Sequence, residues 1–280
     1  MKAKNNEQLI AVIGATGQQG GAVVRALRAS GQFKVRALSR NPDKHRDFAD
    51  ELVEADLNRP ETLKAAFAGA HGIFLVTNFA EAGTDEFKQA TTAVRVARDA
   101  CVKHFVWSTL PDVETISGGR FDVPHFTGKA RVDQIVQEAG FVNHTFVIAP
   151  FFYQNLAGAL APQKQADGSM RWSLPLDPSV RCIHMGDITE LGNIVAGAFD
   201  HPDQAGNGEY LPLVGDFMSF NGIVDTLNRQ GHNFSFTQVP STSSPLSSPE
   251  LRRSPQCSGT SKRIPTWVRS HATKLRSQTK

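Results

Sequence analysis

The sequence predicts an α/β fold in which a doubly wound parallel sheet is joined to a smaller α+β region. Short apolar, β-branched runs alternate with helix-length amphipathic segments, and a glycine-rich turn follows the first of these runs. The 280 residues suffice for one main domain with a companion. We expect residues 1–155 to form the sheet domain and residues 156–240 the smaller region, some of whose strands return to the sheet, before a tail at 241–280.

The first strand and the first helix enclose the glycine-rich turn. Residues 8–13 form a short apolar run typical of a buried parallel strand, and residues 21–29 have the apolar spacing of a helix. The residues that join them are Gly14-Ala15-Thr16-Gly17-Gln18-Gln19-Gly20. Strand, glycine turn and helix in this order are typical of a Rossmann dinucleotide-binding unit, although such a turn can also be purely structural.

Each glycine of this turn has a physical use when a dinucleotide binds. Gly14 permits the tight turn, Gly17 lets the backbone approach a pyrophosphate, and Gly20 lets the helix pack against the strand. The N-terminus of the helix then faces the phosphates, because its first backbone amides and its dipole both favour an anion.

The residues after the second strand favour the phosphorylated cofactor. Residues 33–39 form this strand, and Arg40 follows it where an NAD site usually presents a carboxylate to the ribose 2′-hydroxyl. A guanidinium can pair with a 2′-phosphate, and Lys44 adds a second positive charge. The alternative is that both are ordinary surface charges. We expect NADP(H) rather than NAD(H).

The third βα unit ends in Asp56 and Leu57, and two roles stay open for the aspartate. Its carboxylate either accepts a hydrogen bond from the adenine amino group or caps the helix that Pro60 opens. Thr77, Asn78 and Phe79 end the next strand, where open α/β sheets place their ligands. The remaining strands of the predicted sheet span residues 72–77, 104–108 and 145–148, and a helix is predicted at residues 84–101.

Composition excludes several other classes of protein. The three cysteines lie far apart, which excludes a disulfide framework and a Cys-x-x-Cys metal site, and the nine histidines form no pair at helical spacing. No window approaches the roughly 18 consecutive apolar residues of a membrane span, and the N-terminus lacks a signal-peptide pattern. We expect no metal and no membrane partner, and a cytoplasmic protein for which the nucleus also stays open.

Residues 241–280 differ in charge from the rest of the chain. They contain eight basic residues and one acidic residue, a net charge of +7, whereas the first 240 residues carry −4. Ten serines and four prolines accompany this charge without a helix-length apolar stripe. We expect a solvated, disordered tail, with an anion-binding arm as the alternative and nucleic acid not favoured as a partner.

Several motifs in one order resemble the NmrA-like family of atypical short-chain dehydrogenases/reductases. They are the glycine turn, residues 35–42, Thr77-Asn78-Phe79, Val123-Pro124-His125-Phe126-Thr127-Gly128-Lys129, Pro150-Phe151-Phe152-Tyr153-Gln154-Asn155, residues 161–164 and residues 187–192. The resemblance covers about residues 8–240 and implies a Rossmann domain with a small α+β domain. It implies either an NADPH-dependent oxidoreductase or an NADP-binding redox-sensing regulator.

The resemblance also implies which residues contact the cofactor. They are Gly14, Ala15, Thr16, Gly17, Gln18, Gln19, Arg40, Lys44, Asp56, Leu57, Thr77, Asn78, Phe79, Lys129, Phe152, Tyr153, Gln154 and Asn155. The last four lie just past the final predicted strand, where an aromatic wall beside the nicotinamide is expected. The alternative for Phe152 is that it fills the interface between the two domains.

The usual acid of short-chain dehydrogenases, a tyrosine four residues before a lysine, is missing. The only tyrosines, Tyr153 and Tyr210, do not have this spacing. His125 occupies that place relative to Lys129, and the family resemblance expects a histidine there. One helical turn separates the two residues, so Lys129 can bind the nicotinamide ribose while His125 donates a proton. The alternative is a histidine that bonds backbone at the start of its helix.

Two functions remain open from the sequence. The first is an NADPH-dependent oxidoreductase acting on a carbonyl, imine or activated double bond of a small-molecule substrate, with Ser108 and Thr109 orienting a carbonyl. The second is a non-catalytic NADP(H) sensor with a protein partner, which the missing tyrosine favours. After Pro240 the resemblance ends, because family members continue with an apolar helical stretch where this chain is basic and rich in serine and proline.

Overall fold

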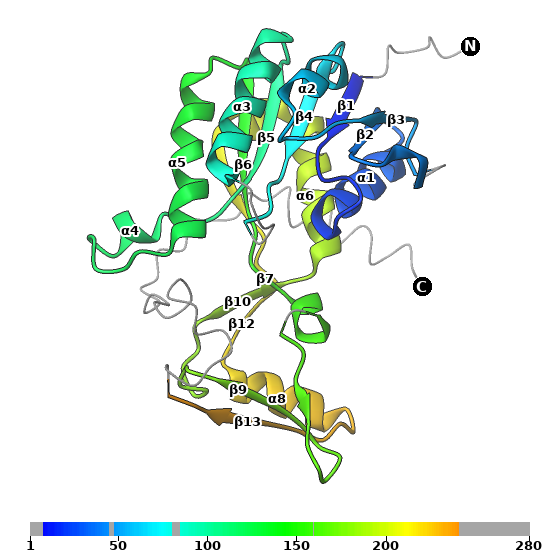
Figure 1. Ribbon diagram of the computed structural model, residues 1–280. Helices are drawn as coiled ribbons and strands as arrows, with labels where there is room; N and C mark the ends of the chain where they lie inside the picture. Colours follow the sequence, from blue (N-terminus) through cyan, green and yellow to red (C-terminus); the bar gives the residue numbers. More distant parts are fainter. Residues whose placement is uncertain (1–7, 45–47, 80–84, 159, 241–280) are drawn as a thin grey trace.

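A computed structural model of the chain describes residues 8–44, 48–79, 85–158 and 160–240. Its centre is a parallel sheet of seven strands in the order β11-β6-β5-β4-β1-β2-β3 (Figure 1). The strands are β1 (Gln8–Val12), β2 (Phe33–Ser39), β3 (Glu51–Glu54), β4 (Gly72–Leu75), β5 (His104–Thr109), β6 (Asn143–Ile148) and β11 (Asn207–Pro212). The winding reverses between β1 and β4, where open α/β sheets bind their ligands.

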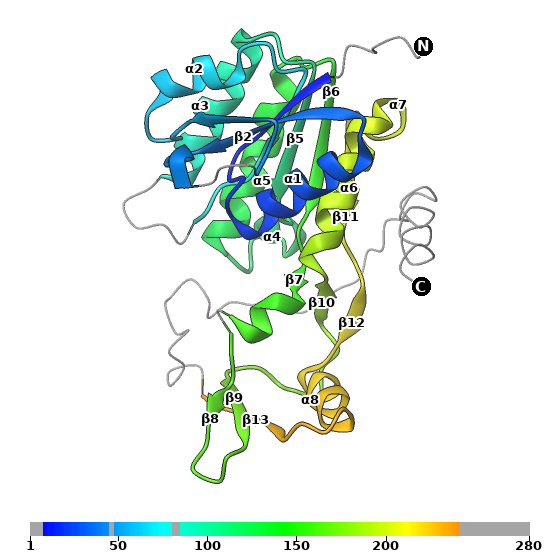
Figure 2. The same ribbon diagram turned by 90° about the vertical axis from the view of Figure 1, so that its right-hand side faces the viewer.

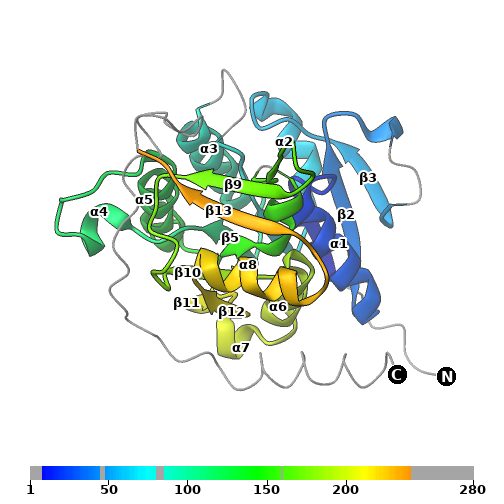
Figure 3. The same ribbon diagram turned by 90° about the horizontal axis from the view of Figure 1, so that it is seen from below.

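Helices cover both faces of this sheet (Figure 3). Helices α1 and α6 share one core cluster with the sheet, and α2, α3 and α5 share the other. These helices are α1 (Gln18–Ser30), α2 (Pro60–Phe67), α3 (Glu86–Asp99), α5 (Pro124–Glu138) and α6 (Ile188–Asp200). Because both faces are covered, β4 and β5 are buried at every position, which explains why β4 is apolar throughout and why β5 carries Phe105, Val106 and Trp107 in succession.

The doubly wound parallel sheet predicted from the sequence is confirmed. The sheet domain does not end at residue 155, however, because later elements return to it. Helix α6, the short helix α7 (Pro202–Ala205) and strand β11 all pack with the sheet domain. The sequence predicts six strands and allows later ones to return to the sheet. Only Leu211 of β11 is buried, so this edge strand lacks the apolar run by which the others were identified.

The smaller lobe lies beyond the carboxyl end of β6 and contains two three-stranded sheets (Figure 2). Its elements are β7 (Phe151–Phe152), the 3-10 helix η2 (Tyr153–Ala157), β8 (Gln163–Lys164), β9 (Met170–Leu174), β10 (Ile183–Gly186), β12 (Asp216–Met218), α8 (Phe220–Arg229) and β13 (Phe234–Gln238). Trp172, Leu174, Met185, Phe220 and Ile223 form its buried core. The lobe thus has its own small core.

Two short elements complete the description, η1 (Pro42–Lys44) and α4 (Val113–Ile116). The expected disordered tail at 241–280 lies outside the described residues. Within the described ranges, no helix has both the length and the apolar character that a membrane crossing needs. The same ranges contain no group of three or more His, Cys, Asp and Glu side chains that could hold a metal ion.

Candidate functional site

The glycine turn between β1 and α1 is closed by its own backbone. The amide of Gly17 donates to the carbonyl of Gly14 at 2.9 Å, and Gly14 has a φ of 67°, in the left-handed region. A Cβ placed on Gly20 would lie 2.2 Å from the Gly14 carbonyl oxygen, so helix and turn approach too closely for any side chain there. Gly17 precedes α1 without a side chain to cap it, which leaves the first helical amides to a ligand.

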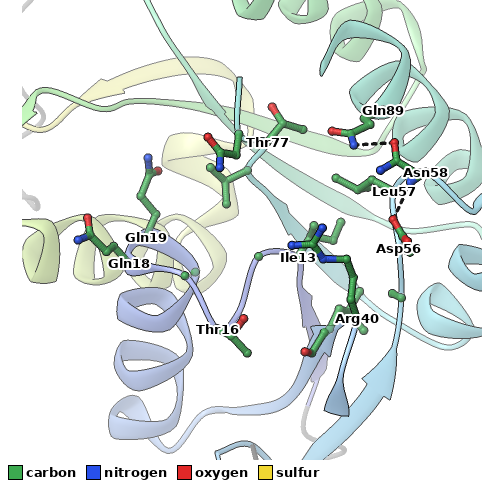
Figure 4. A pocket seen from close by; sticks show the side chains of 18 of the residues that line it. Ile13, Thr16, Gln18, Gln19, Arg40, Asp56, Leu57, Asn58, Thr77 and Gln89 are labelled. Atoms are coloured by element: carbon green, nitrogen blue, oxygen red, sulfur yellow. Dashed lines mark hydrogen bonds between the residues drawn. The ribbon is translucent and has the colours of Figure 1, made fainter. Parts of the chain in front are cut away.

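A cleft of about 500 Å³ opens from this turn across the carboxyl ends of β1 to β4. Figure 4 shows Arg40 across the cleft from Thr16, with Asp56, Leu57 and Thr77 around the rest of its wall. The predicted cofactor residues that line the cleft are Gly14, Thr16, Gly17, Gln18, Gln19, Arg40, Asp56, Leu57, Thr77, Asn78, Phe152 and Asn155. Segments far apart in the sequence therefore meet at the end of the sheet predicted for the ligand.

The other predicted cofactor residues do not line this cleft. Ala15 is buried in the core beneath the turn, and Lys44 is exposed on η1. The Tyr153 hydroxyl donates to Asp216 of the smaller lobe. Burial, with Asp216 as a further cause, raises the pKa of Tyr153 to about 12. The remaining members of this group are Phe79, Lys129 and Gln154.

Gln154 is bound to the start of α6 instead of facing the cleft. Its Nε2 donates to Asp187 Oδ1 at 2.9 Å, and its Oε1 accepts from the backbone amide of Ile188 at 3.2 Å. Phe152 does line the cleft and is only 7% exposed, because it also belongs to the core shared by the sheet and α6. Both predicted roles of Phe152, the cofactor wall and the packing interface, are therefore compatible with its position.

Asp56 does not cap α2, which corrects one of its two predicted roles. The residue before α2 is Arg59, and no side-chain bond caps that helix. Asp56 Oδ1 instead accepts from the backbone amide of Asn58 at 2.9 Å, and Oδ2 lies 3.5 Å from Arg59 Nε. Helix α2 starts with a proline, which has no amide hydrogen that needs a cap. Asp56 therefore stabilises the turn before the helix instead of the helix itself.

Lys129 lies behind the cleft in a buried polar network. Its Nζ donates to the backbone oxygen of Thr77 at 3.2 Å and to Thr77 Oγ1 at 2.9 Å, and lies 2.9 Å from Glu86 Oε1. Thr77 Oγ1 also donates to Glu86 at 2.6 Å, and the ammonium lies 4.6 Å from the centre of the Trp107 ring. Burial lowers the pKa of Lys129, and Glu86 opposes that shift.

This network accounts for the three donor hydrogens of the Lys129 ammonium. A direct hydrogen bond from Lys129 to a cofactor ribose, as the sequence analysis expected, would require one of these contacts to be exchanged. In this structure Lys129 joins α5 to the end of β4 and to the first turn of α3. Glu86 was not identified from the sequence, because it lies 43 positions before its lysine partner and follows no motif.

His125 is held between aromatic rings one helical turn before Lys129. Its imidazole stacks on Phe79, with centroids 4.3 Å apart and an interplanar angle of 21°, and meets the Phe126 ring edge-on at 4.8 Å. The Nδ1 atom is buried. Phe79 is 50% exposed and directly follows Asn78, which lines the cleft, so the stack lies next to the cleft wall.

The residues at the end of β5 point to opposite faces of the sheet. The Ser108 hydroxyl donates to Gln19 Oε1 of the glycine turn at 2.8 Å, so it supports the turn in this structure. Thr109 instead faces buried Asp133, whose carboxylate also accepts from Tyr210 at 2.9 Å. Burial raises the pKa of Asp133 to about 6. The predicted pairing of Ser108 and Thr109 on one carbonyl is not favoured by this alternation.

Several residues that line the cleft were missed by the sequence analysis, among them Asn58 on the turn after β3 and Gln89 on α3. Gln89 Nε2 donates to Asn58 Oδ1 at 2.9 Å. Asn58 directly follows Asp56 and Leu57, so its position at a strand end was a usable signal. Gln89 lies in the interior of a helix, where a polar residue is usually solvent-facing and gives no signal.

Comparison with known proteins places the chain in context. A family model described as the NmrA-like family matches residues 6–249. An NmrA-like family domain-containing protein of Dictyostelium discoideum is 31% identical over 232 residues, which cover 79% of this chain and 76% of the relative. The NmrA-like family domain-containing oxidoreductase FrzB of a Cladobotryum species is 30% identical over 240 residues, 77% of this chain and 71% of the relative.

Solved structures share the fold. NmrA, a negative transcriptional regulator, solved in complex with NADP, aligns with a TM-score of 0.74 at 24% identity over 84% of this chain and 75% of that one. Triphenylmethane reductase of Citrobacter sp., solved with NADP(H), aligns with a TM-score of 0.68 at 21% identity over 84% of this chain and 80% of that one.

Proposed function

The chain belongs to the NmrA-like family, and we propose from this that it is an NADPH-dependent oxidoreductase that reduces a carbonyl, imine or activated double bond of a small molecule. The observation that carries the proposal is the imidazole of His125, stacked on Phe79 next to the wall of a cleft of about 500 Å³. Relatives such as FrzB carry the name oxidoreductase, and they cover most of this chain.

The residues of the cleft fit NADP(H). The close approach of Gly20 to Gly14 and the uncapped start of α1 form a cradle for a pyrophosphate, and a Cβ at position 20 would collide with the backbone of Gly14 and push the helix start away from the turn. Arg40 lines the cleft at the end of β2, where its guanidinium would pair with the 2′-phosphate. When bound, the cofactor supplies the hydride, and the protein must orient the acceptor and supply a proton.

His125 is the residue we assign to proton donation. Because Nδ1 is buried, the proton would leave from Nε2. Stacking on Phe79 and edge-on contact with Phe126 fix the plane of the ring, which limits the directions from which an acceptor can approach. An imidazole is an effective acid near neutral pH because its ordinary pKa is about 6.5.

Lys129 would act from behind Thr77 rather than at the reacting atoms. Its contacts with Thr77 and Glu86 hold the carboxyl end of β4, from which Thr77 and Asn78 enter the cleft. We therefore assign Lys129 the positioning of the cofactor wall.

The proposal is tested by replacing His125 with phenylalanine. In an assay of NADPH oxidation against carbonyl, imine and enone acceptors, His125→Phe should lower turnover about a hundredfold while NADPH affinity stays near wild type. His184→Phe is the matched control, because His184 also stacks on a phenylalanine, Phe217 at 4.5 Å, but in the smaller lobe. Unchanged turnover in His125→Phe, or no oxidation of NADPH by wild type with any acceptor, would contradict the proposal.

A second candidate, an NADP(H)-sensing regulator with a protein partner, is favoured by the absence of a conventional acid. Both tyrosines are bound to carboxylates, Tyr153 to Asp216 and Tyr210 to Asp133. The fold is also that of NmrA, a negative transcriptional regulator. Retention of partner proteins on the immobilised chain should then differ between NADPH and NADP⁺, and identical retention would exclude this candidate.

A further inference from the structure

We propose that the paired side-chain amides of Asn58 and Gln89 recognise the adenine base of the cofactor and set the preference for a 6-amino purine. This inference rests on the proposed binding of NADP(H), and it assigns the specificity of one end of the cleft. The base would lie where the turn after β3 meets α3.

The two amides form one polar unit on the wall of the cleft. Gln89 projects from α3, is 7% exposed, and donates through Nε2 to Asn58 Oδ1 at 2.9 Å (Figure 4). Both residues line the cleft. A side chain that is more than nine-tenths buried yet reaches the cleft wall in a hydrogen bond is a rigid element, because its alternative rotamers are blocked by packing.

Asp56 supports this unit from below. Its Oδ1 accepts from the backbone amide of Asn58 at 2.9 Å, and Oδ2 lies 3.5 Å from Arg59 Nε. The carboxylate therefore fixes the turn that presents Asn58, and Arg59 balances its charge. We accordingly assign Asp56 the positioning of Asn58 rather than the primary contact with the base.

The polarity of the amide pair matches adenine. The bond between them uses one hydrogen of Gln89 and one lone pair of Asn58. Within the described part of the chain, no second hydrogen bond engages Gln89 Oε1 or Asn58 Nδ2. The groups left without a hydrogen bond among the described residues thus include an acceptor atom, Gln89 Oε1, and a donor atom, Asn58 Nδ2, and adenine offers a 6-amino donor beside a ring-nitrogen acceptor, the pair that asparagine and glutamine recognise elsewhere.

Apolar side chains also line the cleft, among them Leu57, which directly precedes Asn58, and Leu63 of α2. Apolar side chains suit the faces of a purine, while the amides would meet its edge. A hypoxanthine base keeps the same faces but has a carbonyl oxygen where adenine has its amino group. This oxygen would repel the Gln89 oxygen instead of donating a hydrogen bond to it.

The test compares reduced NADP with its hypoxanthine analogue by direct binding, using nicotinamide fluorescence and calorimetry. Wild-type protein should bind the adenine form about tenfold more tightly, the effect of one lost hydrogen bond at a buried acceptor. Gln89→Met, which keeps the length of the side chain, should reduce this ratio to near one. Gln134→Met is the matched control, because Gln134 is exposed on α5 and bonds only Glu138 among the described residues.

Asn58→Ala provides a second variant, since Asn58 is exposed and its truncation leaves the core intact. It should also reduce the adenine preference, and thermal melting of each variant establishes that it is folded. Equal affinity of wild type for the two cofactors, or an unchanged ratio in both folded variants, would overturn the inference. Failure of wild type to bind either form would instead contradict the proposed function.

Discussion

Two parts of the cleft wall are built in different ways. At the glycine turn, the backbone of residues 14–20 makes the wall, and contacts between Gly14, Gly17 and Gly20 determine its shape. Near α5, Thr77 lines the cleft and is held from behind by Lys129 and Glu86 in one buried network. The first part depends on the absence of side chains, whereas the second depends on the pairing of charged ones.

The strongest test of this contrast is a methyl group at the glycine turn. Gly20→Ala would place its Cβ 2.2 Å from the Gly14 carbonyl oxygen, and backbone has to move to relieve the contact. We expect a loss of about 3 kcal/mol in the free energy of unfolding, and little remaining affinity for NADPH. Chemical denaturation and fluorescence titration measure the two effects.

Gly128→Ala is the control for this substitution. Gly128 lies within α5, beside Lys129, and a Cβ there would meet nothing within 4 Å. Alanine should raise the free energy of unfolding by about 0.5–1 kcal/mol, because glycine is a poor helix residue. If Gly20→Ala and Gly128→Ala lower the free energy of unfolding equally, the close approach of backbone at Gly20 is not the cause of the loss.

The next largest effect is expected in the side-chain network. Glu86→Gln keeps a hydrogen-bond acceptor for Lys129 but removes the charge that opposes the lowered pKa of this lysine. We expect a loss of about 2 kcal/mol at pH 7, below the ~3–5 kcal/mol of a fully broken buried pair, because glutamine retains hydrogen bonds. Glu114→Gln, in an exposed pair with Arg131, should have little effect.

The pH dependence of Glu86→Gln has a defined sign. In the variant, the pKa of Lys129 falls further below its ordinary value, so the folded state binds this proton less strongly than the unfolded state does. The free energy of unfolding therefore rises as pH increases through the folded pKa towards about 10.5. The deficit relative to wild type should narrow between pH 7 and 10, and a constant deficit in denaturation curves would contradict a buried unpaired ammonium.

The smallest effect is expected at Arg40, on the side of the cleft opposite the turn. Arg40→Ala should weaken NADPH binding about tenfold and NADH binding little, because only NADPH carries the 2′-phosphate. The stability of the free protein should change little, since the residue is exposed. Arg98→Ala serves as the control, because Arg98 is exposed in the last turn of α3 and does not line the cleft. Equal losses for both cofactors in Arg40→Ala would remove the basis for a preference for NADP(H).

The contrast between these two parts of the cleft wall also explains which residues could be predicted from the sequence. The strand, turn and helix around Gly14, and the strand ends at Arg40 and Asp56, occupy short continuous segments whose geometry follows from local backbone rules. These residues line one cleft because the carboxyl ends of parallel strands lie at the same edge of the sheet. Gln154 has an equally local position, but its side chain turned to Asp187, which no local rule indicates.

The sequence by itself determined the doubly wound sheet, the glycine turn and the strand ends that line the cleft, because hydrophobic periodicity and glycine placement act over a few residues. Only the tertiary structure decided that β11 joins the sheet, that Glu86 pairs with Lys129, and that Gln89 meets Asn58. Each of these contacts joins residues at least 31 positions apart, and its energy arises from burial and charge pairing that exist only after the layers have packed.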